Sequence, residues 1–296
     1  MTTTVAGAID RDRLGGMAKI SQGGQGVVYA APAVRTAFTP HMVYKEYRPE
    51  VLAQLDGAAL AAMPVFLESL PAAAGRRMIN LSAWPCAIVE KNGSPTGFVM
   101  PRIPDEFFVS ITTVKGVSRQ MAELQHILNP VDILRQRGLL VSEVERYSLL
   151  RSVADNLDFL HTHGVVVGDL SPKNLLFSLD RSHPHSYFID CDAMRVGGRS
   201  VMPQLETPGW SVPAGEELAT PQSDSYKLGL LALRLLVAEQ DVTDPRMLPA
   251  FVTPMLRQLV TDTLTRPARQ RPGPAVWDRV LVQAVRAAHV RQGMTR

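Results

Sequence analysis

The sequence predicts an α+β fold of two lobes, a small β-rich N-lobe followed by a larger α-helical C-lobe. Three observations support this prediction. Short apolar stretches rich in β-branched residues recur between residues 14 and 103, as expected for a sheet of short strands. From about residue 115 onward, apolar residues recur at helical spacing. Between the two patterns, PRIPDE at 101–106 contains two prolines, which restrict the backbone at the expected lobe boundary.

Four strands are predicted in the N-lobe. They cover VVYAA at 27–31, MVYKEY at 42–47, CAIVE at 86–90 and GFVMPRI at 97–103. The last two are joined by KNGSPTG, in which Asn-Gly is typical of a tight hairpin turn. An alanine-rich stretch, DGAALAAMPVFLESL, interrupts the strands and predicts one helix, which Pro64 either breaks or starts.

Two long helices are predicted in the C-lobe. The first begins at Ser142, because Ser142 and Glu145 have the spacing of a capping box, and it ends near Gly164. Its apolar face is formed by Tyr147, Leu150, Val153, Leu157 and Leu160. The second covers SDSYKLGLLALRLLVAE at 223–239, which is apolar on nearly every side and therefore predicts a buried helix.

Composition excludes several classes of protein. The chain has 296 residues, of which 46% are hydrophobic and 20% charged, as in globular domains. No apolar run reaches the ~20 residues of a membrane-spanning helix, and the first residues do not resemble a signal peptide. A net charge of +3 is too small to indicate nucleic-acid binding. The only two cysteines, Cys86 and Cys191, suit a reducing cytosol, so we expect a cytoplasmic protein. From the small net charge and the lack of long apolar runs, we expect no nucleic-acid or membrane partners.

Two features of the N-lobe have the chemistry of phosphate binding. In ISQGGQGVV at 20–28, Gly23, Gly24 and Gly26 allow the backbone to approach a ligand, and exposed amides in such a turn bind phosphate oxygens. An ordinary glycine-rich hairpin explains these residues equally well. Lys45, on the strand at 42–47, would bind phosphates as a point charge if it lay beneath this turn. A lone strand lysine is otherwise usually directed to solvent.

Three polar residues follow apolar stretches in the C-lobe. Asp169 and Asn174 lie in HGVVVGDLSPKNLLF, and Asp190 ends the apolar part of YFIDCDAM. Carboxylate and carboxamide oxygens suit Mg²⁺, which takes few protein ligands and completes its shell with phosphates. A carboxylate free of metal can accept a proton from a hydroxyl nucleophile, which is the division of roles in phosphoryl transfer. Each acid taken singly is explained as well by a turn cap.

Taken in the order in which they occur along the chain, these segments resemble the sequence motifs of eukaryotic-like Ser/Thr protein kinases. The family's G-x-G-x-x-G-x-V corresponds to SQGGQGVV, beginning at Ser21, and its V-A-I-K to MVYK, ending at Lys45. Its His-Arg-Asp-Leu-Lys-Pro-x-Asn corresponds to VGDLSPKN, ending at Asn174, and D-F-G corresponds to DCD, beginning at Asp190.

The second half of the chain continues the resemblance. TPGW, beginning at Thr207, and PAGE, ending at Glu216, resemble the end of an activation segment. SDSYKLG, which contains Asp224, resembles the start of the buried helix that anchors the catalytic loop. RQRP contains Arg271, for which the resemblance implies an ion pair with Glu216. The matching threonine in Ser/Thr-specific members implies a hydrogen bond between Thr207 and Asp169.

The resemblance implies a bilobal protein-kinase-like fold that binds ATP and Mg²⁺. A single kinase domain would cover 14–285, after a flexible N-terminus at 1–13, with an N-lobe at 14–102 and a C-lobe at 103–296. Asp169 would be the catalytic base, and Asn174 and Asp190 would hold the metal. The residues expected around ATP are Ser21, Gly23, Gly24, Gly26, Val28, Val43, Lys45, Glu68, Met100, Pro101, Ile103 and Leu176.

Two parts of this expected ATP site rest on separate reasoning. Glu68, 23 residues after Lys45, is the acid expected to hold the lysine; the alternative is a surface position on its helix. At the expected hinge, Pro101 lacks an N–H but still offers a carbonyl to the adenine amino group, while the N–H of Ile103 serves a ring nitrogen. The apolar side chains expected above and below the adenine ring would be core residues in either case.

Five departures from the family's motifs bear on the expected chemistry. Ser21 replaces the first loop glycine. Asp192 replaces the glycine of D-F-G, where its carboxylate either binds a second metal or caps a turn, and we favour the cap. Val167 and Gly168 replace the His and Arg before Asp169. Ser171 replaces the catalytic-loop lysine, and Lys173 is the expected substitute. Because Gly168 carries no charge, we expect activity without phosphorylation of the activation segment.

Two alternative functions remain open from the sequence. GDL…N without the arginine also resembles small-molecule phosphotransferases of the aminoglycoside or choline kinase type. The chain could also be a pseudokinase that binds nucleotide without turnover. The DCD string and WPCAIVEKNGSPTGFVMPRI most resemble a bacterial subgroup of kinases that is encoded together with phosphatases. That resemblance implies a partner phosphatase and a protein substrate that the sequence does not name.

Overall fold

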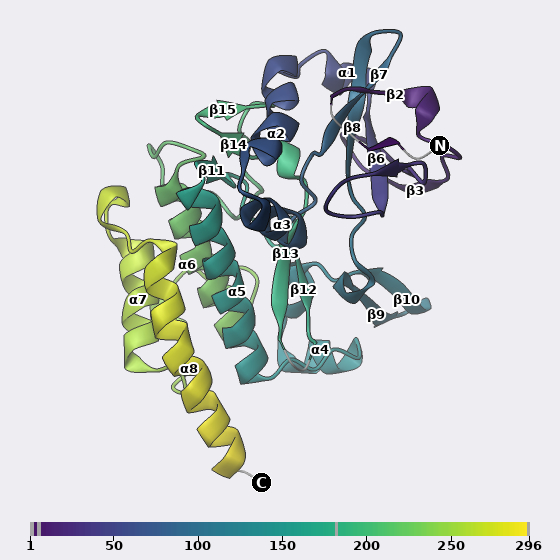
Figure 1. The fold of residues 1–296 in the computed structure, drawn as a ribbon. Helices are drawn as coiled ribbons and strands as arrows, with labels where there is room; N and C mark the ends of the chain where they lie inside the picture. The colour runs from purple at the N-terminus through teal and green to yellow at the C-terminus, as the bar shows by residue number, and fades with distance from the viewer. Residues whose placement is uncertain (1–2, 5–6, 181–182, 295–296) are drawn as a thin grey trace. The chain divides into compact units, whose positions relative to one another are not determined.

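The computed structural model describes residues 3–4, 7–180 and 183–294 of the chain. It is a mixed α+β structure with a β-rich N-terminal part and a helical C-terminal part (Figure 1). Two compact units can be distinguished. The N-terminal unit contains Met1–Ile103 and Phe188–Pro203, and the C-terminal unit contains Pro104–Tyr187 and Gln204–Arg296.

The N-terminal unit is built on a six-stranded sheet with the order β2-β7-β8-β6-β4-β3. Neighbouring strands are antiparallel, except that β2 and β7 are parallel. The strands are β2 (Ile9–Asp10), β3 (Lys19–Gln22), β4 (Gly26–Ala30), β6 (Met42–Tyr47), β7 (Ala87–Lys91) and β8 (Ser94–Pro101). The four strands predicted from the sequence correspond to β4, β6, β7 and β8.

The hairpin between β7 and β8 turns where the sequence predicts it. Asn92 and Gly93 have φ values of +53° and +74°. Two consecutive residues with positive φ form the turn whose twist matches that of the two strands, and asparagine and glycine tolerate this conformation best.

Three helices belong to the N-terminal unit: α1 (Pro49–Leu52), α2 (Gly57–Ser69) and α3 (Ala72–Leu81). The prediction that Pro64 breaks or starts a helix is wrong, because α2 continues through it. Pro64 removes one backbone hydrogen bond from the helix. The Asp56 carboxylate offsets this loss by accepting from the N–H groups of Ala58 and Ala59, and the helix buries Leu60 and other apolar side chains.

The structure also differs from the expectation of a flexible segment at 1–13. Within it, β2 pairs with β7, Ile9 is only 3% exposed, and Arg11 forms an ion pair with Glu46. A buried side chain and a strand pairing order these residues against the sheet. Residues 1–2 and 5–6 of the same segment lie outside the described residues.

Short elements complete the N-terminal unit. Strand β1 (Thr3–Thr4) pairs in parallel with β5 (Val34–Arg35). The later segment of the unit contains a 3₁₀ turn at Cys191–Ala193 and the paired strands β14 (Arg195–Val196) and β15 (Arg199–Ser200).

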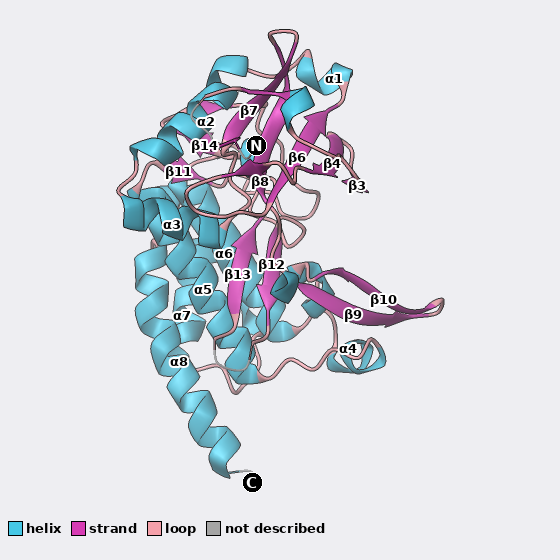
Figure 2. Cartoon of the chain, turned by 45° about the vertical axis from the view of Figure 1, so that its right-hand side comes forward, coloured by secondary structure: helices cyan, strands magenta, loops and turns pink. Residues whose placement is uncertain are grey.

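The C-terminal unit begins with a short 3₁₀ helix at Asp105–Phe107 and then a hairpin, rather than with α-helices. Strands β9 (Phe108–Thr113) and β10 (Gly116–Met121) are antiparallel and extend away from the long helices of the unit (Figure 2). The prediction of helical structure from about residue 115 is therefore wrong for the first residues, since β-branched residues on both sides of Gly116 favour a hairpin. Further along the chain are α4 (Val131–Gln136), β11 (Val165–Val166), β12 (Leu175–Ser178) and β13 (His185–Phe188).

Four longer helices form the rest of the C-terminal unit. They are α5 (Glu143–Thr162), α6 (Pro221–Val237), α7 (Pro254–Thr265) and α8 (Pro274–Met294). Helices α5 and α8 lie side by side, as do α6 and α7 (Figure 1). The capping box at Ser142 and Glu145 is confirmed, and Gly164 follows α5 with a φ of +74°. The five apolar residues predicted to form one face of α5 are all buried, and α6 is buried along most of its length, as predicted.

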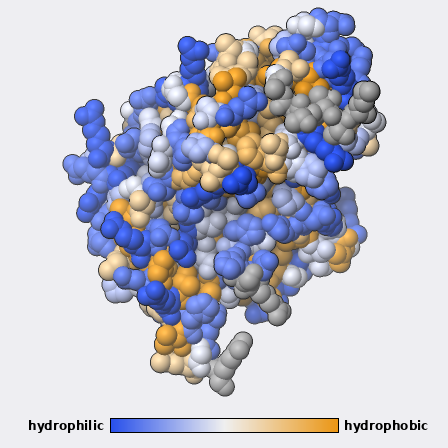
Figure 3. All heavy atoms as spheres, viewed as in Figure 1, coloured by the Kyte–Doolittle hydropathy of each residue, from blue (hydrophilic) through white to orange (hydrophobic). Residues whose placement is uncertain are grey.

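Hydrophobic side chains remain at the surface in a few places. The end of α8 exposes Val290 and Met294, and Figure 3 shows hydrophobic surface along the C-terminal part of this helix. Among the described residues, no helix combines the length and apolar character needed to span a bilayer.

Candidate functional site

One face of the sheet in the N-terminal unit carries several of the predicted ATP-binding residues. Val28 on β4 pairs with Lys45 on β6, and Val43 on β6 pairs with Met100 on β8. Side chains of directly paired residues point to the same face, and so do side chains two residues apart on a strand. Val28, Val43, Lys45 and Met100 therefore share one face. Pro101, the last residue of β8, is paired with Met42.

The glycine-rich segment forms the turn between β3 and β4. Ser21 lies on β3, and Gly23 and Gly24 lie in the turn, where a Cβ would meet no atom within 4 Å. Gly26 differs, because a Cβ there would lie 2.1 Å from the carbonyl oxygen of Glu46 on β6. Strand packing within the sheet thus requires glycine at position 26, while positions 23 and 24 remain open for close approach by a ligand.

Lys45 lies at the centre of a buried polar cluster. Lys45 has an exposed fraction of only 5%. Its ammonium lies 2.8 Å from Gln25 Oε1 and 2.9 Å from both carboxylate oxygens of Asp192. A longer contact of 3.2 Å reaches Asp190 Oδ1. Tyr47, two residues after Lys45, donates its hydroxyl to Asp192 Oδ2 at 2.6 Å.

Two expectations about this cluster are wrong. Glu68, expected to hold Lys45, lies exposed on α2, and the carboxylates paired with Lys45 in the described residues are those of Asp190 and Asp192. Asp192 was expected to cap a turn; it is instead buried and paired. Spacing misled for Glu68, because distance along the chain does not determine which face of α2 turns toward the sheet. For Asp192, the sequence does not show that the 3₁₀ turn at Cys191–Ala193 lies beside Lys45.

Burial and charge act in opposite directions on this cluster. Burial alone would lower the pKa of Lys45, but the charges and hydrogen bonds of Asp192 and Asp190 more than offset it, so the pKa lies above the ordinary lysine value. Burial, and then the charge of Asp192, raise the pKa of Tyr47. Lys45 is therefore a fixed cation, and Tyr47 is a hydrogen-bond donor to Asp192.

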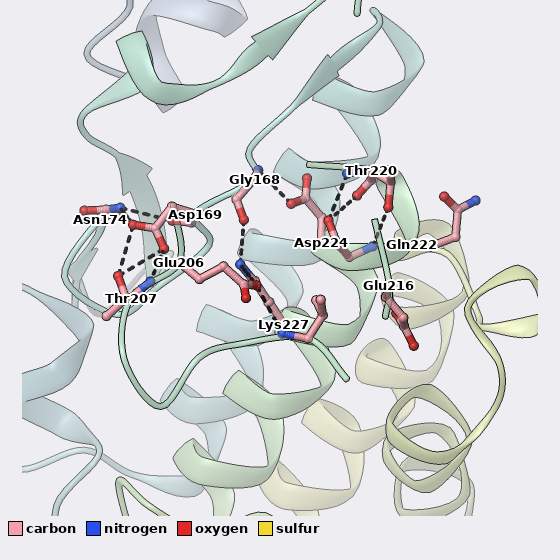
Figure 4. Close-up of polar contacts among 12 residues, drawn as sticks. Gly168, Asp169, Asn174, Glu206, Thr207, Glu216, Thr220, Gln222, Asp224 and Lys227 are labelled. Carbon is pink, nitrogen blue, oxygen red and sulfur yellow. Dashed lines mark hydrogen bonds and ion pairs between the residues drawn. The ribbon is translucent and has the colours of Figure 1, made fainter. Parts of the chain in front are cut away.

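A second cluster lies in the C-terminal unit around Asp169 (Figure 4). Asp169 Oδ1 accepts from the backbone N–H of Thr207 at 3.1 Å and from its hydroxyl at 3.0 Å. The amide of Asn174 donates to Asp169 Oδ2 at 2.9 Å and to the Asp169 carbonyl at 3.0 Å. The expected contact between Thr207 and Asp169 is present. Lys173 is exposed.

Backbone contacts hold the loop that carries Asp169. The buried carboxylate of Asp224 accepts from the N–H group of Val167 at 2.8 Å. It also accepts from the N–H group of Gly168 at 2.9 Å (Figure 4). Lys227, one turn further along α6, donates to the carbonyl oxygen of Gly168 at 2.8 Å. Gly168 itself has a φ of +73°, which residues other than glycine rarely adopt.

Lys227 also fixes the segment that contains Thr207. Its ammonium lies 2.9 Å from Glu206 Oε1, which in turn accepts from the N–H of Val212 at 3.1 Å. Lys227 is buried and Glu206 nearly so. Sequence reasoning missed Lys227 and Glu206, as it missed Gln25 and Tyr47. A lysine inside an otherwise apolar helix was the available signal for Lys227, because an ammonium in such a place requires a partner.

The ion pair predicted between Glu216 and Arg271 is present. Both terminal nitrogens of Arg271 donate to the Glu216 carboxylate. The Arg271 side chain is 1% exposed and that of Glu216 is 21% exposed. The guanidinium also lies over the ring of Tyr226, 4.8 Å from its centroid. The segment that ends at Glu216 is thereby attached to α6 and to the turn before α8.

The two clusters bring together different parts of the predicted site. The N-terminal unit contains Asp190 and all of the predicted ATP-binding residues except one, including Lys45. The exception is Leu176, which is buried in the C-terminal unit. The C-terminal unit holds Asp169 and Asn174. In the part of the chain that the structure describes, no three His, Cys, Asp or Glu side chains are grouped to bind a metal ion.

The two predicted magnesium ligands, Asp190 and Asn174, belong to different units, and each has an oxygen of the type that Mg²⁺ binds. Asp190 exposes half of its side chain. The amide nitrogen of Asn174 donates to Asp169, which leaves the amide oxygen, a ligand of the type that Mg²⁺ binds.

A search against protein-family models finds none that matches this chain.

Proposed function

We propose that the chain is a Ser/Thr protein kinase with a bilobal protein-kinase-like fold, which transfers the γ-phosphate of ATP to a protein hydroxyl. The observation that carries this proposal is the hydrogen bonding of Asp169 by both Asn174 and Thr207. A base that accepts a hydroxyl proton needs a fixed orientation, and contacts from two sides to its carboxylate provide it.

The residues have separate roles in this proposal. Asp169 orients the attacking hydroxyl and accepts its proton. Lys45, held as a cation in the N-terminal unit, binds phosphate oxygens. Mg²⁺, when bound by Asp190 and Asn174 together with the phosphates, would neutralise their negative charge. The backbone N–H of Gly23 donates to the carbonyl oxygen of Gly26 at 2.9 Å, so in this proposal the amide of Gly24 binds a phosphate oxygen.

The attachment of the segment before Glu216 supports a protein substrate rather than a small molecule. The Glu216–Arg271 and Glu206–Lys227 pairs hold this segment at two points, next to the residue that contacts Asp169. A surface held in this way can bind an extended peptide without paying a large ordering entropy. Two buried free cysteines also suit a reducing compartment, and we propose that the protein acts in the cytoplasm.

Two variants test the assignment of roles, because they should fail differently. Asp169→Asn keeps the shape of the side chain but loses the base, so nucleotide binding should persist while transfer from labelled ATP falls by about 10²-fold or more. Asp190→Asn should weaken Mg²⁺-dependent ATP binding itself. Both are compared with the unmodified chain, with Mg²⁺ or with EDTA, on a generic protein substrate.

The same assay separates the alternative functions. Transfer to aminoglycosides or choline but not to protein would favour a small-molecule phosphotransferase. ATP binding without transfer to any acceptor would favour a pseudokinase. Unchanged transfer in Asp169→Asn would reject Asp169 as the base.

A further inference from the structure

The buried cluster around Lys45 contains one more carboxylate than the proposed reaction has used. An ammonium has three N–H groups. In this cluster it faces Gln25 at 2.8 Å, both oxygens of Asp192 at 2.9 Å and, at a longer 3.2 Å, Asp190. Two acids therefore contact the same cation, although only one of them was assigned a role.

The two acids differ in exposure. The side chain of Asp192 is 1% exposed, whereas that of Asp190 is 50% exposed. A fully buried carboxylate is stable only with partners that remain in place, and Asp192 has two of them, Lys45 and Tyr47. Asp190, exposed and at the longer distance, can exchange its contact with Lys45 for a metal ion and leave one N–H of Lys45 for a phosphate oxygen.

We propose that Asp192 is the residue that positions Lys45 for the phosphates, in the place of Glu68, and that Tyr47 orients Asp192. This inference rests on the proposed function, since it assigns the support of its phosphate-binding lysine. Asp192 itself acts through Lys45 and does not touch the nucleotide. Asp190 is thereby left for the metal, which separates the two carboxylates of the DCD string by role.

The first test compares Asp192→Asn with Glu68→Gln, the same loss of charge at the rival acid. Binding of ATP with Mg²⁺ and binding of adenosine are measured by calorimetry. We expect Asp192→Asn to weaken ATP binding at least tenfold and adenosine binding less than twofold, because only ATP has phosphates for Lys45. Glu68→Gln should leave both affinities unchanged. Equal effects of the two variants, or an equal loss of ATP and adenosine binding, would overturn the proposal.

A double-mutant cycle tests whether Asp192 acts through Lys45. In the Lys45→Met background, Asp192→Asn should cause no further loss of ATP affinity. Lys45→Met alone leaves Asp192 buried and unpaired by its cation, and should lower the thermal midpoint by roughly 5–15 °C. The double variant should recover most of that shift. Additive losses in either measurement would contradict the proposal.

Two further comparisons keep the test decisive. If Asp192→Asn does not fold, Tyr47→Phe retains both charges and should reduce the ratio of ATP to adenosine affinity in the same direction; no change would count against the proposal. If the unmodified chain neither binds ATP nor transfers phosphate, the proposed function fails, whereas the thermal midpoints still decide the pairing. An active chain in which Asp192→Asn behaves like Glu68→Gln rejects only this inference.

Discussion

Gly168 shows how one residue determines the loop that carries Asp169. Its φ of +73° lies in the left-handed region, its N–H donates to Asp224 and its carbonyl accepts from Lys227. A Cβ at this position would lie 2.4 Å from Gln204 Oε1 and 3.2 Å from Ala219 Cβ. The local backbone therefore requires glycine at this position, because it disfavours any side chain.

Gly168→Ala should destabilise the protein by about 1–3 kcal/mol, from left-handed strain and crowding. It should also reduce phosphate transfer, because the next residue is Asp169. Gly164→Ala is the matched control: Gly164 has a φ of +74°, but a Cβ there meets no atom within 4 Å. We expect the control to lose stability by strain alone and to keep its activity. Urea unfolding and transfer from labelled ATP measure both; equal activity in the two variants would contradict the prediction.

At the scale of elements, α6 is the helix that organises the C-terminal unit. Its first turns provide Asp224 to the Gly168 backbone, Tyr226 to the Arg271 guanidinium and Lys227 to Glu206. These three side chains lie within about one turn of α6. They join one buried helix to the Asp169 loop, to the segment before Glu216 and to the turn before α8. Loss of any of them should affect the same loop.

Arg271→Ala should remove the ion pair with Glu216 and leave that carboxylate without its partner. Breaking a buried pair costs about 3–5 kcal/mol, and we expect the lower end because Glu216 is 21% exposed. The thermal midpoint should fall, and activity should fall with it. Arg269→Ala is the control, since Arg269 is exposed two residues earlier on the same turn. Equal midpoints for the two variants would show that the pair does not contribute to stability.

Lys227→Met should release Glu206 from its cation and the Gly168 carbonyl from its donor. Glu206 is mostly buried, and leaving its carboxylate without a cation is costly, so Lys227→Met alone should lower the thermal midpoint. Adding Glu206→Gln removes the uncompensated charge and should restore part of the loss. Differential scanning calorimetry of the two single variants and the double variant measures this coupling. Strict additivity would mean that the pair contributes nothing as a pair.

For the molecule as a whole, these contacts bear on how activity is controlled. Phosphorylation commonly orders an activation segment by supplying an anion to a basic residue. In this chain Gly168 offers no cation, and Glu206 already supplies a carboxylate to Lys227 from within the segment. The segment is thus held by charges that the chain itself carries.

We therefore expect activity without phosphorylation of the segment at 193–215. Purified protein is treated with phosphatase, mass spectrometry verifies that the segment is unmodified, and the initial rate of phosphate transfer is compared with that before treatment. The rate should be unchanged. A fall of the rate by tenfold or more that is reversed by re-phosphorylation would contradict this expectation. It would indicate that a basic residue elsewhere in the chain binds the phosphate group of the modified segment.

Local patterns in the sequence were sufficient for many elements. The turn at Asn92 and Gly93 and the capping box at Ser142 depend on interactions within a few residues. The strand at 42–47 pairs with distant strands, but its own apolar residues indicate it, so all three signals are visible in a short window. The Glu216–Arg271 pair was predicted instead from the resemblance of the segments PAGE and RQRP to known motifs, and the structure contains it. Where the window contained mixed signals, prediction failed: Pro64 lies inside a helix, and the segment after residue 108 forms a hairpin.

By itself, the sequence determined the order of elements, the α+β character and which acids and lysines belong to candidate motifs. Only the tertiary structure decided how these charges are paired. Asp192 reaches Lys45 across 147 residues of chain, and Lys227 reaches Gly168 across 59. The physical reason is that burial makes an unpaired charge costly, so each buried lysine takes the carboxylate or carbonyl that folding brings nearest. That choice depends on how strands and helices pack, which no spacing along the chain specifies.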